Sequence, residues 1–153
     1  MVFKTTDELK NYILSRCEKA VYETKEKVFK LIYAVLAQYY EEYKPIYYER
    51  TYQFFTSLVD TDVRKEGNGF IAEVYFDLSS IDYQSRKGNR AYSDSWSDEK
   101  IIDEIMTGGS HGGYTAPINN TKVWTESMEI LDADLIEILK HELIKNGIPV
   151  RTK

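Results

Sequence analysis

The first third of the chain has the hydrophobic spacing of one long amphipathic helix. Apolar side chains recur every three or four residues from Leu9 to Tyr43, and no glycine or proline interrupts them before Pro45. Thr5 and Glu8 form a capping box ahead of this stripe, in which the hydroxyl accepts from the Glu8 amide and the carboxylate reaches back. Because proline disfavours helix at the residue before it, we expect the helix to end just ahead of Pro45.

The length of this helix has a consequence for assembly. A helix of about 35–40 residues, at roughly 1.5 Å per residue, is more than about 50 Å long. A compact domain, with a radius of gyration of about 13 Å for 100 residues, does not cover such a helix along its whole length. Either the helix bends or breaks at the polar stretch around Thr24, or part of its stripe packs on another chain. We expect Leu31 to Tyr43 to pack on the protein's own sheet and the stretch before Thr24 to contact a neighbouring subunit.

Two strands and a tight turn are predicted after the helix. Residues 54–63 read as one strand and residues 70–77 as another, in which every second side chain from Phe70 to Phe76 is apolar. Asn68 and Gly69 lie between them, and an Asn-Gly pair favours the positive φ of a two-residue hairpin turn. The sequence therefore predicts a central antiparallel hairpin.

The C-terminal half predicts two more helices. Residues 98–106 have the spacing of a short helix, and a longer one follows through Leu135, Ile138, Leu139 and Leu143 to Gly147, a predicted C-terminal cap. Residues 148–150 are predicted as a short edge strand. We therefore expect a single α+β domain over residues 1–153. Its long N-terminal helix, straight or bent, and its C-terminal helix pack on a small, mainly antiparallel sheet with a central hairpin.

Composition and charge narrow the function. The chain has 153 residues, 42% hydrophobic and 29% charged, as in ordinary globular domains. Its 13 tyrosines suit surfaces that are buried on one side and wet on the other, at interfaces or at the edges of a core. A net charge of −5 argues against a protein that binds nucleic acid by neutralising phosphates. No apolar stretch approaches the ~20 residues of a membrane span and no signal peptide is evident, so no membrane partner is expected.

The residues suited to catalysis or metal binding do not form a convincing site. Cys17 is the sole cysteine, which excludes a cysteine zinc site and fits a reducing cytoplasm. Residues 108–113, Gly-Gly-Ser-His-Gly-Gly, match the bare Gly-x-Ser-x-Gly pattern of a nucleophile elbow, but no strong strand precedes them. His141 has Lys145 where a zinc-protease helix needs a second histidine. We therefore predict no catalytic, cofactor-binding or metal site, while a small hydrolase using Ser110 and His111 remains an alternative.

The order of features resembles a known family of viral structural proteins. A long helix leads to a Tyr-x-Arg-Thr segment, the hairpin follows, and a His-Gly-Gly loop and a tryptophan precede the last helix. This order is similar to that of the head–tail joining, or tail-completion (neck), proteins of long-tailed bacteriophages and prophages. The resemblance assigns interaction and structural roles to Tyr43, Pro45, Tyr48, Arg50, Thr51, His111, Gly112, Gly113 and Trp124.

The resemblance implies a structural virion protein without catalysis. Such proteins form rings between the capsid connector and the tail, and DNA passes through their lumen without sequence-specific binding. The implied partners are other copies of the chain together with phage connector and tail proteins. The implied location is the virion, after synthesis in the cytoplasm of the bacterial host. A small phage- or plasmid-encoded inhibitor of a host protein would share the acidic charge and exposed aromatic side chains, and stays open as an alternative.

Overall fold

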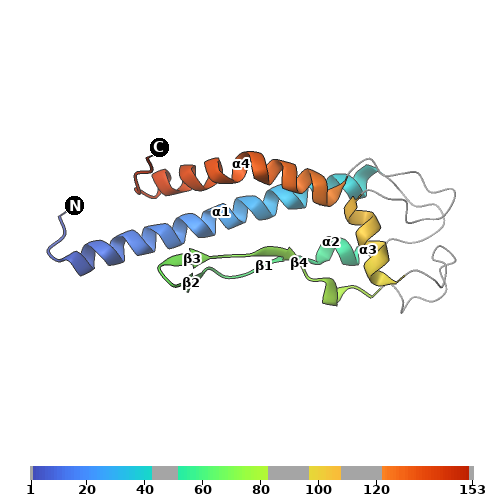
Figure 1. Ribbon diagram of the computed structural model, residues 1–153, viewed down its shortest axis with the longest axis horizontal. Helices are drawn as coiled ribbons and strands as arrows, with labels where there is room; N and C mark the ends of the chain where they lie inside the picture. The colour runs from blue at the N-terminus through green and yellow to red at the C-terminus, as the bar shows by residue number, and fades with distance from the viewer. Residues whose placement is uncertain (1, 43–51, 83–96, 108–121, 152–153) are drawn as a thin grey trace. The chain divides into compact units, whose positions relative to one another are not determined.

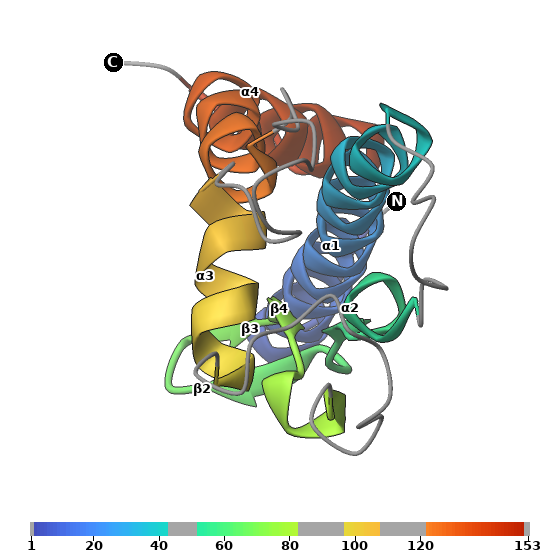
Figure 2. The same cartoon turned by 90° about the vertical axis from the view of Figure 1, so that its right-hand side faces the viewer.

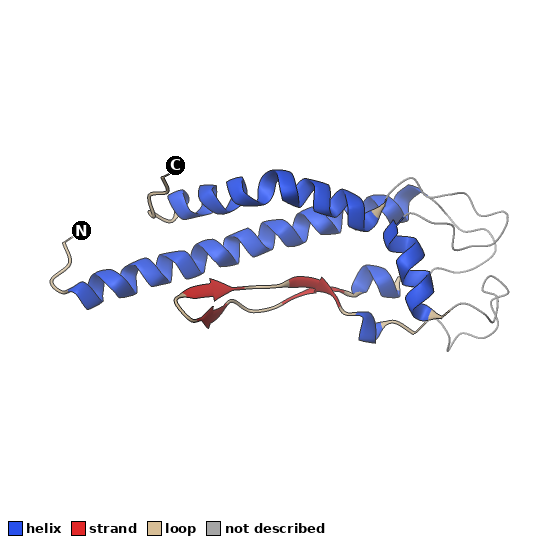
Figure 3. Cartoon of the chain, viewed as in Figure 1, coloured by secondary structure: helices blue, strands red, loops and turns tan. Residues whose placement is uncertain are grey.

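The computed structural model describes residues 2–42, 52–82, 97–107 and 122–151. Figures 1 and 3 show helices at both ends of the chain and short paired strands between them. The helices are α1 (Thr6–Glu42), α2 (Gln53–Thr56), η1 (Leu78–Ser80, a 3-10 helix), α3 (Asp98–Thr107) and α4 (Val123–Lys145). The strands are β1 (Leu58–Asp60), β2 (Arg64–Glu66), β3 (Gly69–Ile71) and β4 (Val74–Phe76). This is the predicted α+β class, with a long N-terminal helix, a C-terminal helix and small antiparallel sheets.

The chain divides into two compact units. The first unit contains Met1–Phe29, Asp60–Val74 and Leu131–Lys153, and the second contains Lys30–Val59 and Tyr75–Ile130. Helices α1 and α4 each contribute residues to both units. The single domain expected from the sequence stays a prediction.

Helix α1 begins as the sequence predicts. The Glu8 amide donates to the Thr5 hydroxyl at 3.1 Å, while the Glu8 carboxylate accepts from the Lys4 amide at 2.7 Å, one residue further out than expected. The helix then continues without interruption to Glu42. Thr24 is buried, and its hydroxyl donates to the Ala20 carbonyl at 2.8 Å within the helix. The predicted alternative of a break at Thr24 is therefore wrong.

The β2–β3 hairpin confirms the predicted turn region but shifts its register. Glu66 pairs with Gly69, so the two-residue loop is Gly67-Asn68 and not Asn68-Gly69. Gly67 has a φ of 56°, whereas Asn68 is not among the described residues with positive φ. Glycine with positive φ at the first loop position is typical of a type II′ turn, which needs no special residue at the second.

The two predicted strands are only partly correct. Residues 53–56 form α2, because Phe54 is fully buried and stacks on Phe76 with ring centroids 4.8 Å apart. Residues 70–77 are divided between β3 and β4. The predicted alternation is nevertheless confirmed, since Phe70, Ala72, Val74 and Phe76 are each less exposed than the residues between them.

A bulge separates the two sheets. Thr61 donates its amide to the Glu73 carbonyl at 2.9 Å, whereas the partner of Arg64 is Ile71. Two residues of one strand therefore stand opposite one residue of the other, which is the definition of a β-bulge. The Glu73 amide donates to the Thr61 side-chain oxygen at 3.0 Å rather than to its carbonyl. The Thr61 carbonyl is left available for a partner outside the ladder.

Helix α4 ends at the predicted cap. The Gly147 amide donates to the Ile144 carbonyl and the Ile148 amide to the Leu143 carbonyl, both at 2.9 Å. Gly147 has a φ of 82°. This is the Schellman arrangement, in which a left-handed residue lets the chain satisfy the last carbonyls of a helix. Residues 148–150, predicted as an edge strand, form no strand.

The second unit is organised around aromatic rings of α1 and α2. Tyr33 and Tyr40 each pack against Phe55, with centroids 4.9 and 5.3 Å apart, and Tyr40 stacks on Tyr52 at 5.2 Å. Figure 2 shows α2 beside the later turns of α1. The apolar stripe of α1 is therefore buried within the protein in its later half, as predicted, although these ring contacts are with a short helix and not with the sheet.

The register of the turn gives a direct test by mutation. Gly67→Ala forces a side chain into the left-handed region and is expected to cost about 1 kcal/mol of unfolding free energy. Gly69→Ala is the matched control, since Gly69 lacks a positive φ and its added Cβ would lie 3.9 Å from the Glu66 carbonyl oxygen, an ordinary contact, so no loss of unfolding free energy is expected. Urea denaturation of both variants measures the difference. If Gly69→Ala lowered the unfolding free energy more than Gly67→Ala, the turn would lie at Asn68-Gly69 instead.

Candidate functional site

The polar middle of α1 makes ion pairs with other elements of the first unit. Residues 23–27 read Glu-Thr-Lys-Glu-Lys, the stretch that the sequence marks as a weak point. In the structure these residues form ion pairs both with the strand segment and with α4. We call the two groups the Lys25 cluster and the Glu142 cluster.

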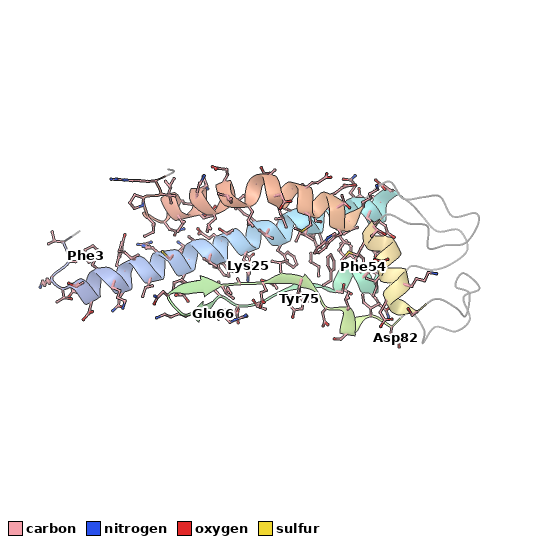
Figure 4. The ribbon with its side chains drawn as sticks, in the orientation of Figure 1. Phe3, Lys25, Phe54, Glu66, Tyr75 and Asp82 are labelled. Atoms are coloured by element: carbon pink, nitrogen blue, oxygen red, sulfur yellow. The ribbon has the colours of Figure 1, made fainter. Side chains whose placement is uncertain are left out.

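The Lys25 cluster joins α1 to the strands. Lys25 is buried, and Figure 4 shows it between α1 and the strands. Its ammonium pairs with Asp60 and donates to the Thr61 carbonyl at 3.2 Å, the carbonyl that the bulge leaves outside the ladder. The ammonium also lies 4.8 Å from the centre of the Tyr22 ring, a cation–π contact. Burial by itself would lower the pKa of Lys25, but the hydrogen bond and charge of Asp60 outweigh it and raise the pKa, so Lys25 stays charged.

The Glu142 cluster joins α1 to α4. The Glu142 side chain has 0% exposed surface, and its oxygens lie 2.5 Å from the Lys27 ammonium and 3.0 Å from that of Lys145. His141 contributes a longer contact of 3.3 Å. The hydrogen bond from Lys27 opposes the effect of burial, and together with that from Lys145 it holds the pKa of Glu142 far below its ordinary value. Glu142 is therefore ionised although no water reaches it.

A second row of contacts extends this cluster. Glu23 accepts from the Asn146 amide group at 2.7 Å and lies 3.3 Å from the Lys145 ammonium. Residues four apart share one face of a helix, so Glu23 and Lys27 face Asn146 and Glu142 respectively. The order is reversed between the two helices, so α1 and α4 run antiparallel in this unit. Asn146 also caps α4 by donating to the Glu142 carbonyl at 2.9 Å.

The first turns of α1 are only partly covered. No residue from Thr6 to Lys19 is buried, and the first buried side chain is that of Ala20. Leu9 and Ile13 are nevertheless apolar, with 39% and 41% of their surface exposed, and they continue the stripe that Ala20 starts in the core. In Figure 1 these turns extend past the end of α4 and the tip of the β2–β3 hairpin. The expectation that the stretch before Thr24 contacts a neighbouring subunit stays a prediction, and Ala20 in this stretch is already buried within the chain.

Helix α4 has a second uncovered surface. All six residues from 132 to 137 are exposed, around the whole circumference of the helix. Leu135 and Ile136 are among them, and Ile136 has 65% of its surface exposed. Exposed leucine and isoleucine side chains that lie close together on one helix are candidates for protein–protein contact, and both α1 and α4 carry such a pair in the first unit. We call these two surfaces the α1 face (Leu9 and Ile13) and the α4 face (Leu135 and Ile136).

The residues singled out by the family resemblance are mostly not tested. Tyr43, Pro45, Tyr48, Arg50, Thr51, His111, Gly112 and Gly113 lie outside the described residues, as does Ser110. Trp124, the second residue of α4, is 52% exposed and is therefore accessible to a partner. His141 lies near the end of α4, as predicted, and contacts Glu142. Cys17 is a free, half-buried thiol near the α1 face.

Sequence reasoning missed Glu142. The sequence does contain a signal for it. Glu142 follows Ile138 by four residues and Leu139 by three, so it occupies a position of the apolar stripe where an apolar residue is expected. Within the described ranges, no group of three or more histidine, cysteine, aspartate or glutamate residues is arranged to hold a metal ion. None of the helices in the described part of the chain is long and apolar enough to cross a membrane.

The Glu142 cluster predicts a specific acid sensitivity. Because the folded-state pKa of Glu142 is depressed, its stabilising contribution is complete above the ordinary value of 4.5 and is lost as the pH falls below it. Glu142→Gln is expected to cost about 1–2 kcal/mol at pH 7, less than for a deeply buried pair, because both lysine partners are about half exposed.

The difference between wild type and this variant should narrow as the pH falls from 5 to 3, measured by urea denaturation. Glu137→Gln is the matched control: Glu137 is a largely exposed glutamate of the same helix, paired with Lys140, and its loss should change stability by less than about 0.5 kcal/mol at either pH. Equal effects of the two variants would mean that Glu142 is not held as described.

Comparison with known proteins identifies a family. No curated protein and no solved structure matches the chain. The sequence model of the YomN family matches residues 5–145, which includes α1, both sheets, α3 and all of α4. The match covers both ion-pair clusters and nearly the whole chain, and on this basis the protein belongs to the YomN family.

Proposed function

We propose that the protein is a structural virion-assembly subunit, a ring-forming head–tail connector or tail-completion protein that joins the capsid connector to the tail. The observation that carries the proposal is the partly exposed start of α1, where Leu9 and Ile13 continue the apolar stripe ahead of the first buried residue, Ala20. A free helix end with exposed leucine and isoleucine is stabilised when a neighbouring subunit covers it.

Exposed tyrosines support the same function. Tyr22, Tyr33, Tyr52 and Tyr75 are all more than 40% exposed, and tyrosine is enriched in protein interfaces, where its ring is buried and its hydroxyl stays hydrated. Trp124 adds a large exposed ring of the kind found at interface hot spots.

Charge supports the passage of DNA through such a ring. The net charge of −5 means that an assembled ring carries a large negative charge, which repels phosphates and opposes tight binding of DNA to a lumen wall. A ring of this kind lets DNA pass without sequence-specific contacts.

Oligomeric state tests the proposal. Multi-angle light scattering on the purified chain, alone or after its connector and tail partners are added, should show that several 17.9 kDa copies associate, with the mass of any bound partner added to theirs. The thiol of Cys17 should react with a thiol reagent in dilute monomer and become protected in the assembly, because it lies near the α1 face. Ile71→Glu, on the β2–β3 hairpin, is a control that should leave the mass unchanged. A chain that stays monomeric at all concentrations and ignores those partners would refute the proposal, as would a protein that instead captures one host factor at fixed stoichiometry.

A further inference from the structure

The chain contains two Asn-Gly dipeptides, Asn68-Gly69 and Asn146-Gly147. Asparagine is one of the thermolabile residues of proteins. Its side-chain carbonyl carbon is open to attack by the backbone nitrogen of the next residue, above all before glycine, which has no Cβ to hinder the approach. The structure places the two dipeptides in opposite surroundings.

Asn68-Gly69 lies at the tip of the β2–β3 hairpin. Gly67, Asn68 and Gly69 are all exposed, and Gly69 belongs to the last pair of the ladder, opposite Glu66 (Figure 4). Among the residues of β2 and β3, only Phe70 is not exposed. Opening of this tip therefore uncovers little apolar surface and is a local event, separate from global unfolding.

Asn146-Gly147 is held at the end of α4. Asn146 has 5% of its surface exposed, and its side-chain amide donates to a Glu23 carboxylate oxygen at 2.7 Å and to the Glu142 carbonyl at 2.9 Å. The Gly147 amide donates to the Ile144 carbonyl at 2.9 Å as part of the Schellman cap. Attack of the Gly147 nitrogen on the Asn146 side chain requires these hydrogen bonds to break.

We propose that Asn68 is a site of spontaneous deamidation in the folded protein, whereas Asn146 is protected. When the hairpin tip opens, solvent base removes the proton of the Gly69 amide, and the nitrogen attacks Cγ of Asn68. The N–Cγ bond forms, the Cγ–Nδ2 bond breaks, and the leaving nitrogen takes a proton from water and departs as ammonia. The product is a cyclic imide.

Water then opens this ring at either carbonyl. Attack at the side-chain carbonyl gives aspartate, and attack at the backbone carbonyl gives isoaspartate, whose main chain passes through Cβ and Cγ. Both products add a negative charge to a tip that already carries Glu66. Isoaspartate also inserts a methylene into a two-residue loop, and because loop length selects the turn type, the pairing of Glu66 with Gly69 is lost. The hairpin tip therefore changes with time after synthesis, without an enzyme.

Mass spectrometry of the full chain, incubated at mildly alkaline pH and then digested with trypsin, tests the proposal. Cleavage after Lys65 and Lys145 puts the two asparagines on separate peptides, and a zero-time sample corrects for reaction during digestion. In the folded protein Asn68 should convert at least about tenfold faster than Asn146, because only Asn68 reacts through local opening. In the urea-unfolded chain the two asparagines should convert at similar rates. Similar rates in the folded chain, or an Asn68 that stays intact while the unfolded chain converts, would overturn the proposal.

The glycines on either side of Asn68 give two variants with opposite effects. The added Cβ of Gly69→Ala makes only an ordinary contact with the hairpin but hinders ring closure, so conversion should slow at least about tenfold. Gly67→Ala weakens the turn that has to open, so conversion should be up to about fivefold faster. Circular dichroism checks that both variants fold. A Gly69→Ala chain that converts as fast as wild type would exclude the Gly69 nitrogen as the nucleophile, and a Gly67→Ala chain that converts no faster would exclude the opening step.

Discussion

Glu142 is an ionised carboxylate with no exposed surface, and Lys27 and Lys145 hold it between α1 and α4. Removing a charge from water is costly, so the carboxylate stays charged only while its cations remain in place. Such an interaction contributes little net stability compared with apolar packing, but it fixes position, because a slip of one residue would leave the charge unpaired. We infer that Glu142 sets the register of the two helices in the first unit. The Lys25 cluster fixes the position of α1 on the strands, because the Lys25 ammonium donates to the Thr61 carbonyl that the bulge leaves outside the ladder.

This register determines which part of α1 is covered. Glu23 contacts Asn146, and the Schellman cap at Gly147 ends α4 directly afterwards. Because the helices run antiparallel, α4 stops covering α1 a short distance before Glu23, and burial along α1 begins at Ala20. Of the preceding apolar side chains, Leu9 and Ile13 are exposed, whereas Tyr12 and Leu14 are half-buried. This exposed start of the stripe is the observation on which the proposed assembly role rests.

The local signals in the sequence predicted much of this fold. The Thr5–Glu8 box, the helical stripes and Gly147 were correct because caps and periodicity depend on neighbouring residues. Residues 53–56 became helical because Phe54 is buried against Phe76, a tertiary contact that no local pattern contains. The turn shifted by one residue because Gly67 and Gly69 flank Asn68 and either register is locally acceptable. The pairing of Lys25 with Asp60 and of Glu142 with Lys27 was not predicted, since these partners lie more than 30 residues apart in the sequence. The segments that carry the family resemblance lie for the most part outside the described residues.

Hydrogen exchange of the α1 amides, followed by NMR on dilute monomer, tests the central claim most directly. The claim is that the two clusters hold the middle of α1, that the aromatic contacts of the second unit hold its later half, and that its first turns are held less firmly. Amides of residues 9–19 should then exchange through local fraying, at least about a hundredfold faster than those of residues 24–29, which should open only with the clusters. Uniform protection along the whole of α1 would contradict the account, because it would mean that the first turns are already held within the single chain.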